Sequence, residues 1–232
     1  MKAIVGFIMM GGSASLETQI HRKLPEGVEM ATTRVPFHNV SYKGLLEMVD
    51  KIPEAARILA EARPNVIAVT SFTGSCIRGR EMVNVIQQAT GIPAIVPAPE
   101  FVRVLRLIGA SHIAIVTCFE TELRMLERVF FHNNGIEVVR FVSTAALRET
   151  DPFQVSQIDY DLVLKQLRGV DFSGVEAVVV DLPTFFISPE LQRELERFIK
   201  VPVLNMVQVL LWSTLGWLGE PTDGLYISKF LP

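Results

Sequence analysis

Short runs of Val, Ile and Ala alternate along the chain with longer stretches in which apolar residues recur at helical spacing. The short runs predict strands at residues 3–9, 66–70, 94–96, 113–117, 138–142, 177–180 and 203–204. The longer stretches predict helices at residues 45–62, 79–90, 120–133, 159–167 and 189–198. Strands that alternate with helices in this way are typical of βαβ units, so we expect an α/β protein with a parallel sheet covered on both faces.

A weak internal repeat divides this pattern into two similar parts. Residues 65–71 and 176–181 each lead through a loop into a helix, and each helix is followed by a strand that contains a proline, Pro93 or Pro202. The order recurs at a spacing of roughly 110 residues, which favours a tandem duplication. Convergence of two ordinary βαβ units on the same order is the alternative reading.

Composition narrows the class of protein. Of 232 residues, 49% are hydrophobic and 20% are charged, which is typical of a compact globular protein, and 22 basic against 25 acidic residues provide no basic surface for nucleic acid. The apolar segments 1–10 and 201–218 are too short or too interrupted to span a membrane, and no signal peptide is apparent, so we expect a cytoplasmic protein. Only Cys76 and Cys118 are present, which excludes a disulfide framework.

Four loops follow a predicted strand and precede a helix, at residues 10–15, 71–75, 118–121 and 181–184. In a parallel sheet such loops meet at one edge, where free N–H groups and helix dipoles attract anions. Small hydroxylated residues dominate three of the loops, so a small carboxylate could be bound there without Lys or Arg. Each Ser or Thr taken alone is better explained as a helix cap. No nucleotide-binding fingerprint or histidine pair with metal-ligand spacing occurs, so we expect no cofactor and no metal.

Several segments, taken in order, resemble the Asp/Glu racemase superfamily, specifically its maleate isomerase and arylmalonate decarboxylase branch. They cover almost the whole chain, at residues 6–17, 21–28, 32–35, 73–75, 78–79, 114–119, 135–138 and 201–212. The resemblance implies two pseudosymmetric Rossmann-like domains with the site between them, which we place at residues 1–105 plus 206–232 and at residues 106–205. It also implies chemistry without a cofactor at a carbon next to a carboxylate, performed by a cysteine thiolate from each half.

The chain departs from that family scheme at the positions that carry the chemistry. The first cysteine position corresponds to Ser71, and the second corresponds to Leu182, or to Asp181 if the register slips by one. Both usual catalytic cysteines are therefore missing. The family's substrate-contacting tyrosine corresponds to Phe119, and its two asparagines correspond to Ser13 and Pro152. A serine hydroxyl is a far poorer nucleophile than a thiolate unless a base activates it, so maleate isomerisation by the usual route is not expected.

Three residues are therefore the candidate catalytic groups. Asp181 ends a buried strand at the predicted cleft, where apolar surroundings would raise its pKa into a useful range, although a helix cap or a surface position would explain it equally well. Ser71 occupies the first thiol position, and Cys118 could replace a missing thiol or simply be a small buried residue. We expect substrate contacts from Gly12, Ser13, Phe72, Thr73, Gly74, Phe119, Leu182, Pro183 and Thr184.

These residues predict a cofactor-independent isomerase, racemase or decarboxylase that acts on a small carboxylic acid through an enediolate-like intermediate. A binding protein of the same fold, which kept the pocket and lost the chemistry, is the alternative, and an obligate structural partner of an active relative is a third reading. The expected partners are a small carboxylate substrate and further copies of the chain in a homodimer or higher homo-oligomer, without nucleic acid or membrane.

Overall fold

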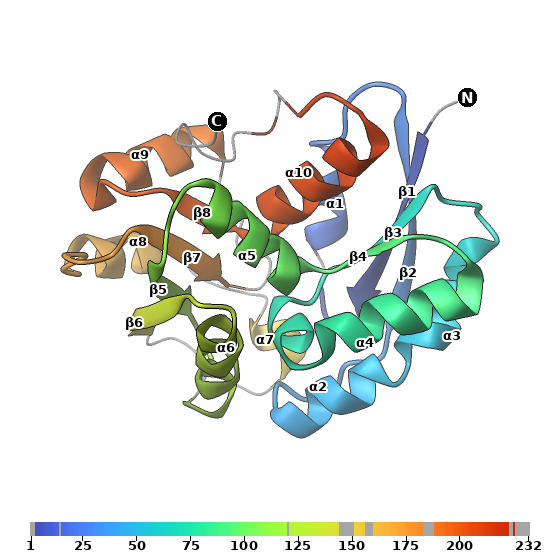
Figure 1. The fold of residues 1–232 in the computed structure, drawn as a ribbon, viewed down its shortest axis with the longest axis horizontal. Coiled ribbons are helices and arrows are strands. Elements are labelled where there is room, and N and C mark those ends of the chain that lie inside the picture. Colours follow the sequence, from blue (N-terminus) through green and yellow to red (C-terminus); the bar gives the residue numbers. More distant parts are fainter. Residues whose placement is uncertain are drawn as a thin grey trace.

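The computed structural model describes residues 3–13, 15–119, 121–143, 151–155, 160–182, 188–222 and 225. Two four-stranded parallel sheets form the framework (Figure 1). The first has the order β2-β1-β3-β4, with β1 at Ala3–Met10, β2 at Val28–Val35, β3 at Val66–Val69 and β4 at Ala94–Ile95. The second has the order β6-β5-β7-β8, with β5 at His112–Thr117, β6 at Glu137–Ser143, β7 at Ala177–Asp181 and β8 at Val203–Asn205.

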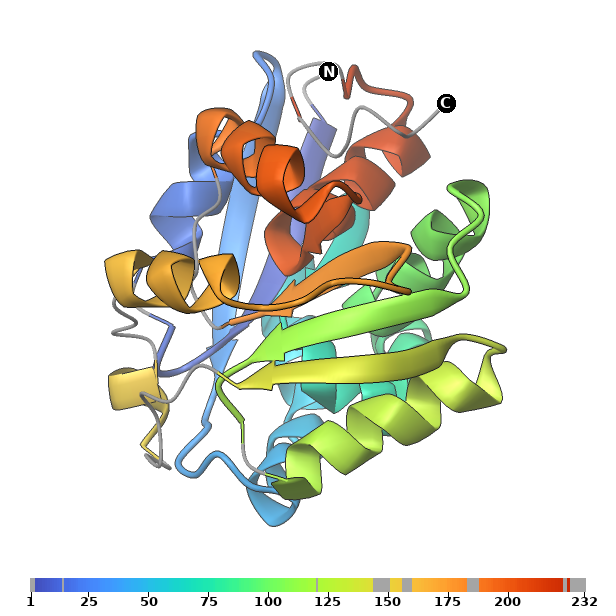
Figure 2. The same ribbon diagram turned by 90° about the vertical axis from the view of Figure 1, so that its left-hand side faces the viewer.

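The strand order is the same in the two sheets when the strands of each are numbered along the chain. All described strand pairs are parallel, and the strands of one sheet run across the direction of the other (Figure 2). The structure therefore confirms the expected fold class, two similar α/β units with parallel sheets flanked by helices.

Helices cover both sheets. In chain order they are α1 (Leu16–His21), α2 (Tyr42–Val49), α3 (Ile52–Ala60), α4 (Phe72–Thr90), α5 (Pro97–Leu107), α6 (Thr121–Asn133), α7 (Pro152–Val155), α8 (Tyr160–Arg168), α9 (Pro189–Ile199) and α10 (Met206–Leu218). None of the helices in the described part of the chain has the length and apolar character that crossing a bilayer would require.

Two of the predicted helices have different bounds in the structure, and some elements were not predicted at all. The helix expected at 45–62 is two helices, because Pro53 stands in the first turn of α3 and starts a new helix there. The helix expected at 79–90 begins at Phe72, and Arg78, at φ −134° and ψ 34°, interrupts its regular geometry. The polar edge strand β2, the proline-rich helix α5 and the short helices α1 and α7 were not predicted.

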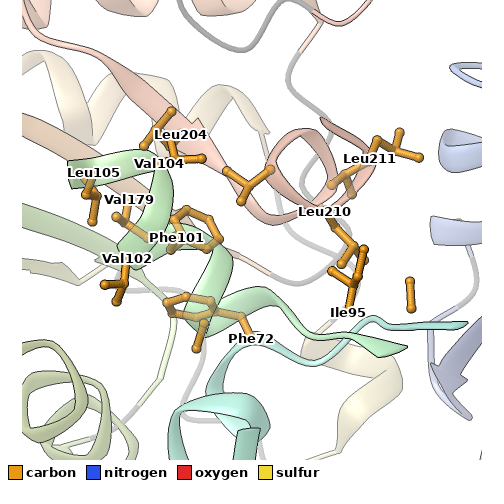
Figure 3. Packing of buried hydrophobic residues seen from close by; sticks show 14 of the residues in the cluster. Phe72, Ile95, Phe101, Val102, Val104, Leu105, Val179, Leu204, Leu210 and Leu211 are labelled. Carbon is orange, nitrogen blue, oxygen red and sulfur yellow. The ribbon is translucent and has the colours of Figure 1, made fainter. Parts of the chain in front are cut away.

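The largest cluster of buried apolar residues belongs to both halves of the chain. Figure 3 shows its centre, where Phe101 of α5 and Phe72 of α4 meet edge to face with ring centroids 4.8 Å apart. Val179 and Leu204 from the second sheet, and Leu210 and Leu211 from α10, belong to the same cluster. Because α5 and α10 lie between the two sheets (Figure 1), this apolar packing fixes one sheet against the other.

Replacing Phe101 with Ala should destabilise the whole protein, because the ring is fully buried at the junction of the two halves. We expect a loss of about 3–5 kcal/mol in the free energy of unfolding, which denaturant titration would measure. Leu107→Ala, on the same helix but 49% exposed, is the control and should change the free energy by less than about 1 kcal/mol. Equal losses for the two variants would contradict this account of the core.

Candidate active site

A cavity of about 70 Å³ lies where β1, β3, β5 and β7 end. This volume is several times what a single water molecule needs. Its described polar lining is supplied by Ser13, Thr70, Ser71, Thr73 and Asp181. The apolar lining consists of Met10, Leu16, Phe37, Val40, Leu45, Phe72, Phe119, Leu123, Pro152, Leu182 and Met206, with Gly12. No Lys, Arg or His side chain lines the cavity among the residues that the structure describes.

Most of the residues expected from the sequence meet at this cavity. Gly12, Ser13, Ser71, Phe72, Thr73, Phe119, Asp181 and Leu182 all line it, although they come from both halves of the chain. Gly74 and Cys118 are not among the lining residues. Pro183 and Thr184 lie outside the described residues.

The first loop, between β1 and α1, is held by one arginine of the edge strand β2. Arg34 Nη1 donates to the carbonyl oxygens of Met10 at 3.3 Å and Ser13 at 3.0 Å, while its Nη2 lies 2.8 Å from Glu17 Oε2. Thr32 donates to the other oxygen of Glu17 at 2.6 Å, and this hydrogen bond, together with the charge of Arg34, lowers the pKa of Glu17. The ion pair therefore fixes the loop that carries Gly12 and Ser13.

Gly12 is required by the close approach of α7. A Cβ atom at this position would lie 2.9 Å from Pro152 Cβ and 3.2 Å from the backbone nitrogen of Phe153, which is closer than packed carbon atoms come. The glycine therefore lets the first loop pack against α7 at the rim of the cavity.

The second loop places the first turn of α4 at the cavity. Ser71 precedes this helix, and its side chain makes no capping hydrogen bond, which argues against the helix-cap interpretation for this residue. The backbone N–H groups of a first helical turn lack partners within the helix and carry partial positive charge. Here that turn, with the Ser71 and Thr73 hydroxyls, is the described part of the cavity best suited to bind a carboxylate.

Gly74 and Ser75 support this turn from behind. A Cβ atom at Gly74 would lie 2.5 Å from Ser71 Oγ, so only glycine leaves room for the Ser71 side chain. The Ser75 hydroxyl donates to the carbonyl oxygen of Phe72 at 2.7 Å and accepts from the backbone N–H of Ala98 at 2.9 Å, which connects α4 to α5. These two residues therefore position the turn and are not part of the cavity wall.

Two buried carboxyl groups meet beside the cavity. Asp181 is the last residue of β7 and lines the cavity, whereas Glu127 of α6 is fully enclosed behind it. Thr73 Oγ1 lies 2.9 Å from Asp181 Oδ2 and 3.0 Å from Glu127 Oε1. A residue of the first half thus bridges two acids of the second half.

Burial raises the pKa values of both acids. For Glu127, burial is the largest cause, and the adjacent Asp181 raises the pKa further, well above its ordinary value; the Thr73 hydroxyl and the charge of Arg124 act in the opposite direction. Burial also raises the pKa of Asp181, against the hydrogen bonds from Glu127 and Thr73, which lower it. A carboxyl group is a better general acid and base at physiological pH when its pKa is raised from its ordinary value.

Both cysteine thiols are poor candidates for nucleophiles. Burial, followed by the negative charge of Asp181, raises the pKa of Cys118 well above its ordinary value, and burial with the charges of Glu127 and Asp181 does the same for Cys76. Each thiol therefore keeps its proton at neutral pH, and the thiolate is the reactive form.

Gln208, which lies in the last of the segments that resemble the family, has a structural position. Its backbone N–H donates to Asn205 Oδ1, which caps α10, and its side-chain amide donates to Gln192 of α9. Gln192 in turn donates to the carbonyl oxygen of Val203 at 2.7 Å. This buried chain of amides joins α9, β8 and α10 and so supports Met206 at the cavity wall.

Comparison with known proteins agrees with this architecture. The family model described as arylmalonate decarboxylase matches residues 12–230. This chain belongs to the arylmalonate decarboxylase family. A maleate isomerase from Nocardia farcinica is 25% identical to it over an alignment of 230 positions, which covers 94% of this chain and 90% of that protein.

Solved structures show the same fold as this member of the arylmalonate decarboxylase family. The maleate cis-trans isomerase of Nocardia farcinica bound to Tris matches with a TM-score of 0.87 at 21% identity, over 99% of this chain and 97% of that one. A mutant of that isomerase with a covalently bound succinylcysteine intermediate matches with a TM-score of 0.84 at 21% identity, over 96% of each chain. An arylmalonate decarboxylase matches with a TM-score of 0.72 at 15% identity, over 93% of this chain and 92% of that one.

Glu127 is the residue of the carboxyl pair that the sequence interpretation missed. It lies on the buried face of α6 between Leu123 and Phe131, four residues from each, so an acidic side chain occupies an apolar stripe. This acidic residue in an apolar stripe was the one feature of the sequence that could have pointed to Glu127. The role of Glu127 depends on its contacts with Thr73 and Asp181, each of which is 54 residues away along the chain.

The raised pKa of Glu127 predicts how stability depends on pH. The folded state binds more protons than the unfolded state between the ordinary value of 4.5 and the raised folded value. The free energy of unfolding should therefore fall as the pH rises through this range. Glu127→Gln removes this contribution, so its stability should decline less between mildly acidic and mildly alkaline pH.

Denaturant titrations at a series of pH values would measure the difference. Glu122→Gln, an exposed position on the same helix, is the matched control and should follow the wild-type curve. Parallel curves for wild type and Glu127→Gln would contradict the assignment of a raised pKa to Glu127.

Proposed function

We propose that this protein is a cofactor-independent enzyme that isomerises, racemises or decarboxylates a small carboxylic acid of the maleate or arylmalonate type. The observation that carries the proposal is the placement of Asp181, a buried acid with a raised pKa, in a cavity that also contains the first turn of α4. Membership of the arylmalonate decarboxylase family supports the same class of chemistry.

In the proposed reaction the substrate carboxylate binds at the first turn of α4. Free backbone N–H groups there, with the Ser71 and Thr73 hydroxyls, stabilise the negative charge that moves onto the carboxylate as an enediolate forms. Asp181 removes or delivers the proton at the adjacent carbon. Phe72, Phe119 and Leu182 exclude water from the carbanion-like centre, which would otherwise be protonated without control.

This scheme replaces covalent chemistry with proton transfer. The Nocardia isomerase mutant contains a succinylcysteine, a bond between a cysteine and the substrate skeleton. In this chain the resemblance to the family aligns Ser71 and Leu182 with the thiol positions, so we propose that no such adduct forms here. Cys118 is the second choice for the proton carrier, because its thiol is buried and holds its proton tightly.

The experiment that tests the function is a screen of the purified protein against a panel of mono- and dicarboxylic acids, including maleate and arylmalonates. Thermal shift would identify the acids that bind, and NMR in heavy water would follow each of them. Isomerisation, loss of carbon dioxide or incorporation of deuterium next to the carboxylate would support the proposal. Failure of every acid that binds to react would overturn it.

Asp181→Asn should reduce the rate by about 10²–10⁴-fold, because the amide cannot exchange a proton with the substrate. Ser71→Ala should weaken substrate binding and lower kcat/KM. Steady-state kinetics on the substrate found above would measure both effects. Asp171→Asn and Ser173→Ala are the controls, because both residues are exposed and precede the amino end of β7, whereas Asp181 lies at its carboxyl end. Unchanged kinetics in both Asp181→Asn and Ser71→Ala would exclude these residues from the reaction.

The alternative function is a carboxylate-binding protein that has lost the chemistry of its family. The absence of any cysteine from the described cavity lining favours it. Binding of a carboxylate without deuterium exchange or product formation, over a range of pH, would establish this alternative.

A further inference from the structure

If both acids of the Glu127, Thr73 and Asp181 cluster are ionised, the cluster has too few hydrogen-bond donors for its carboxylate oxygens. The Thr73 hydroxyl carries one proton but lies within hydrogen-bond distance of both carboxyl groups. Glu127 Oε2 is buried and has no hydrogen-bond partner among the described residues. Among the described residues, neither Glu127 nor Asp181 forms an ion pair.

Two carboxylates in contact cannot both be ionised in an apolar environment, because each charge opposes the other and neither is solvated. Glu127 is 0% exposed and Asp181 is 7% exposed. A single proton resolves the conflict, since one acid then donates to the other and the Thr73 hydroxyl completes the set of hydrogen bonds. Glu127 is the more enclosed of the two and is the more suitable holder of this proton in the resting protein.

We propose that Glu127 shares one proton with Asp181 through their contact beside Thr73, and that Glu127 thereby controls the protonation state of Asp181 during turnover. Glu127 is absent from the cavity lining, so it acts through Asp181 as a positioning residue. This inference rests on the proposed function, in which Asp181 is the proton carrier.

The shared proton gives a balanced cycle for either reaction. In isomerisation or racemisation, ionised Asp181 takes the proton from a saturated carbon next to the carboxylate, and the C–H electron pair enters the enediolate. The proton on Asp181 exchanges with water while the enediolate turns in the cavity, and Asp181 then returns a proton to its opposite face or to another carbon of an extended enediolate. Glu127 stays protonated and donates to Asp181 throughout. In decarboxylation, the C–C bond breaks, carbon dioxide leaves, the electron pair stays on the enediolate, and the shared proton passes through Asp181 to carbon. A proton from water replaces the shared proton as it leaves the pair, so the two acids are not ionised together.

The groups that face the pair determine when it loses its proton. Arg124, on the same helix as Glu127, stabilises the ionised form of Glu127. Cys76 on α4 and Cys118 after β5 are also close enough for their thiols to be affected by the two acids, and both thiols remain neutral at neutral pH. The raised titration therefore belongs to the two acids as a coupled pair.

The first measurement needs no turnover. Wild-type protein with ¹³C-labelled Asp and Glu carboxyl carbons is titrated by NMR, and infrared difference spectra record protonated carboxyl groups. We expect one carboxyl group that is still protonated at neutral pH, with Thr73→Val shifting its titration. A spectrum in which every carboxyl group is ionised at neutral pH would overturn the shared proton.

The second measurement compares Glu127→Gln with the exposed control Glu122→Gln. The amide keeps a donor toward Asp181 but cannot ionise. The signal of the protonated carboxyl group should vanish in Glu127→Gln only. For isomerisation or racemisation, which needs ionised Asp181, the alkaline limb of the kcat/KM profile against pH should vanish with it. For decarboxylation, which needs the shared proton, this limb should move to lower pH. A purely structural role would lower the rate without changing the shape of this profile.

The outcomes separate this inference from the proposed function. An unchanged pH profile in active Glu127→Gln would overturn the role of Glu127 and leave the function standing. Inactivity of the wild type toward every acid in the panel would overturn the function, and with it the role of Glu127 in turnover. The NMR titration would still show directly whether the pair shares a proton.

Discussion

Apolar packing between the two sheets is the constraint on which the candidate active site depends. Thr73 and Asp181 are 108 residues apart in the chain and belong to different halves, yet their side chains are in hydrogen-bond contact. Phe72, the residue next to Thr73, packs against Phe101 in the cluster that also contains Val179 of β7. The same contacts that hold the halves together thus determine whether the first turn of α4 meets the end of β7.

The buried acids place a cost on this arrangement. Burial of a carboxyl group opposes its ionisation, and neither acid forms an ion pair among the described residues, although the charge of Arg124 favours the ionised form of Glu127. Apolar packing around β7 and α6 offsets this unfavourable free energy and holds the two acids in place. A pair of acids that is unfavourable for stability is useful for proton transfer, because the same burial moves their titration toward neutral pH.

The sequence predicted the fully buried strands and the regularly amphipathic helices α6, α8 and α9, and it missed elements whose pattern is polar or begins with prolines. β3 and β7, buried along their whole lengths, were visible as runs of Val, Ile and Ala. β2 pairs with β1 only and carries Glu29, Thr32 and Arg34, so its pattern resembles a polar loop. The two prolines in the first turn of α5 concealed a helix that lies at the centre of the molecule.

Only the residues of the candidate site that follow a strand could be predicted from the sequence. Ser71 and Asp181 could be placed because the carboxyl ends of parallel strands meet at one edge of a sheet, a rule that needs only the strand positions. Glu127 could not be placed, because it reaches the site from the buried face of a helix, and no local rule states what such a face will contact. Proximity between two acids is a property of the folded chain alone.

The first loop introduces a contrast within the same cavity. Arg34 and Glu17, whose side chains are 37% and 38% exposed, hold the rim through an ion pair that dissolved ions can screen. The carboxyl pair beneath is enclosed by apolar side chains and is shielded from those ions. Ionic strength therefore affects how firmly the loop of Gly12 and Ser13 is held, but it does not change proton transfer by the carboxyl pair. Substrate binding at this loop should respond to salt concentration, whereas turnover should respond to pH.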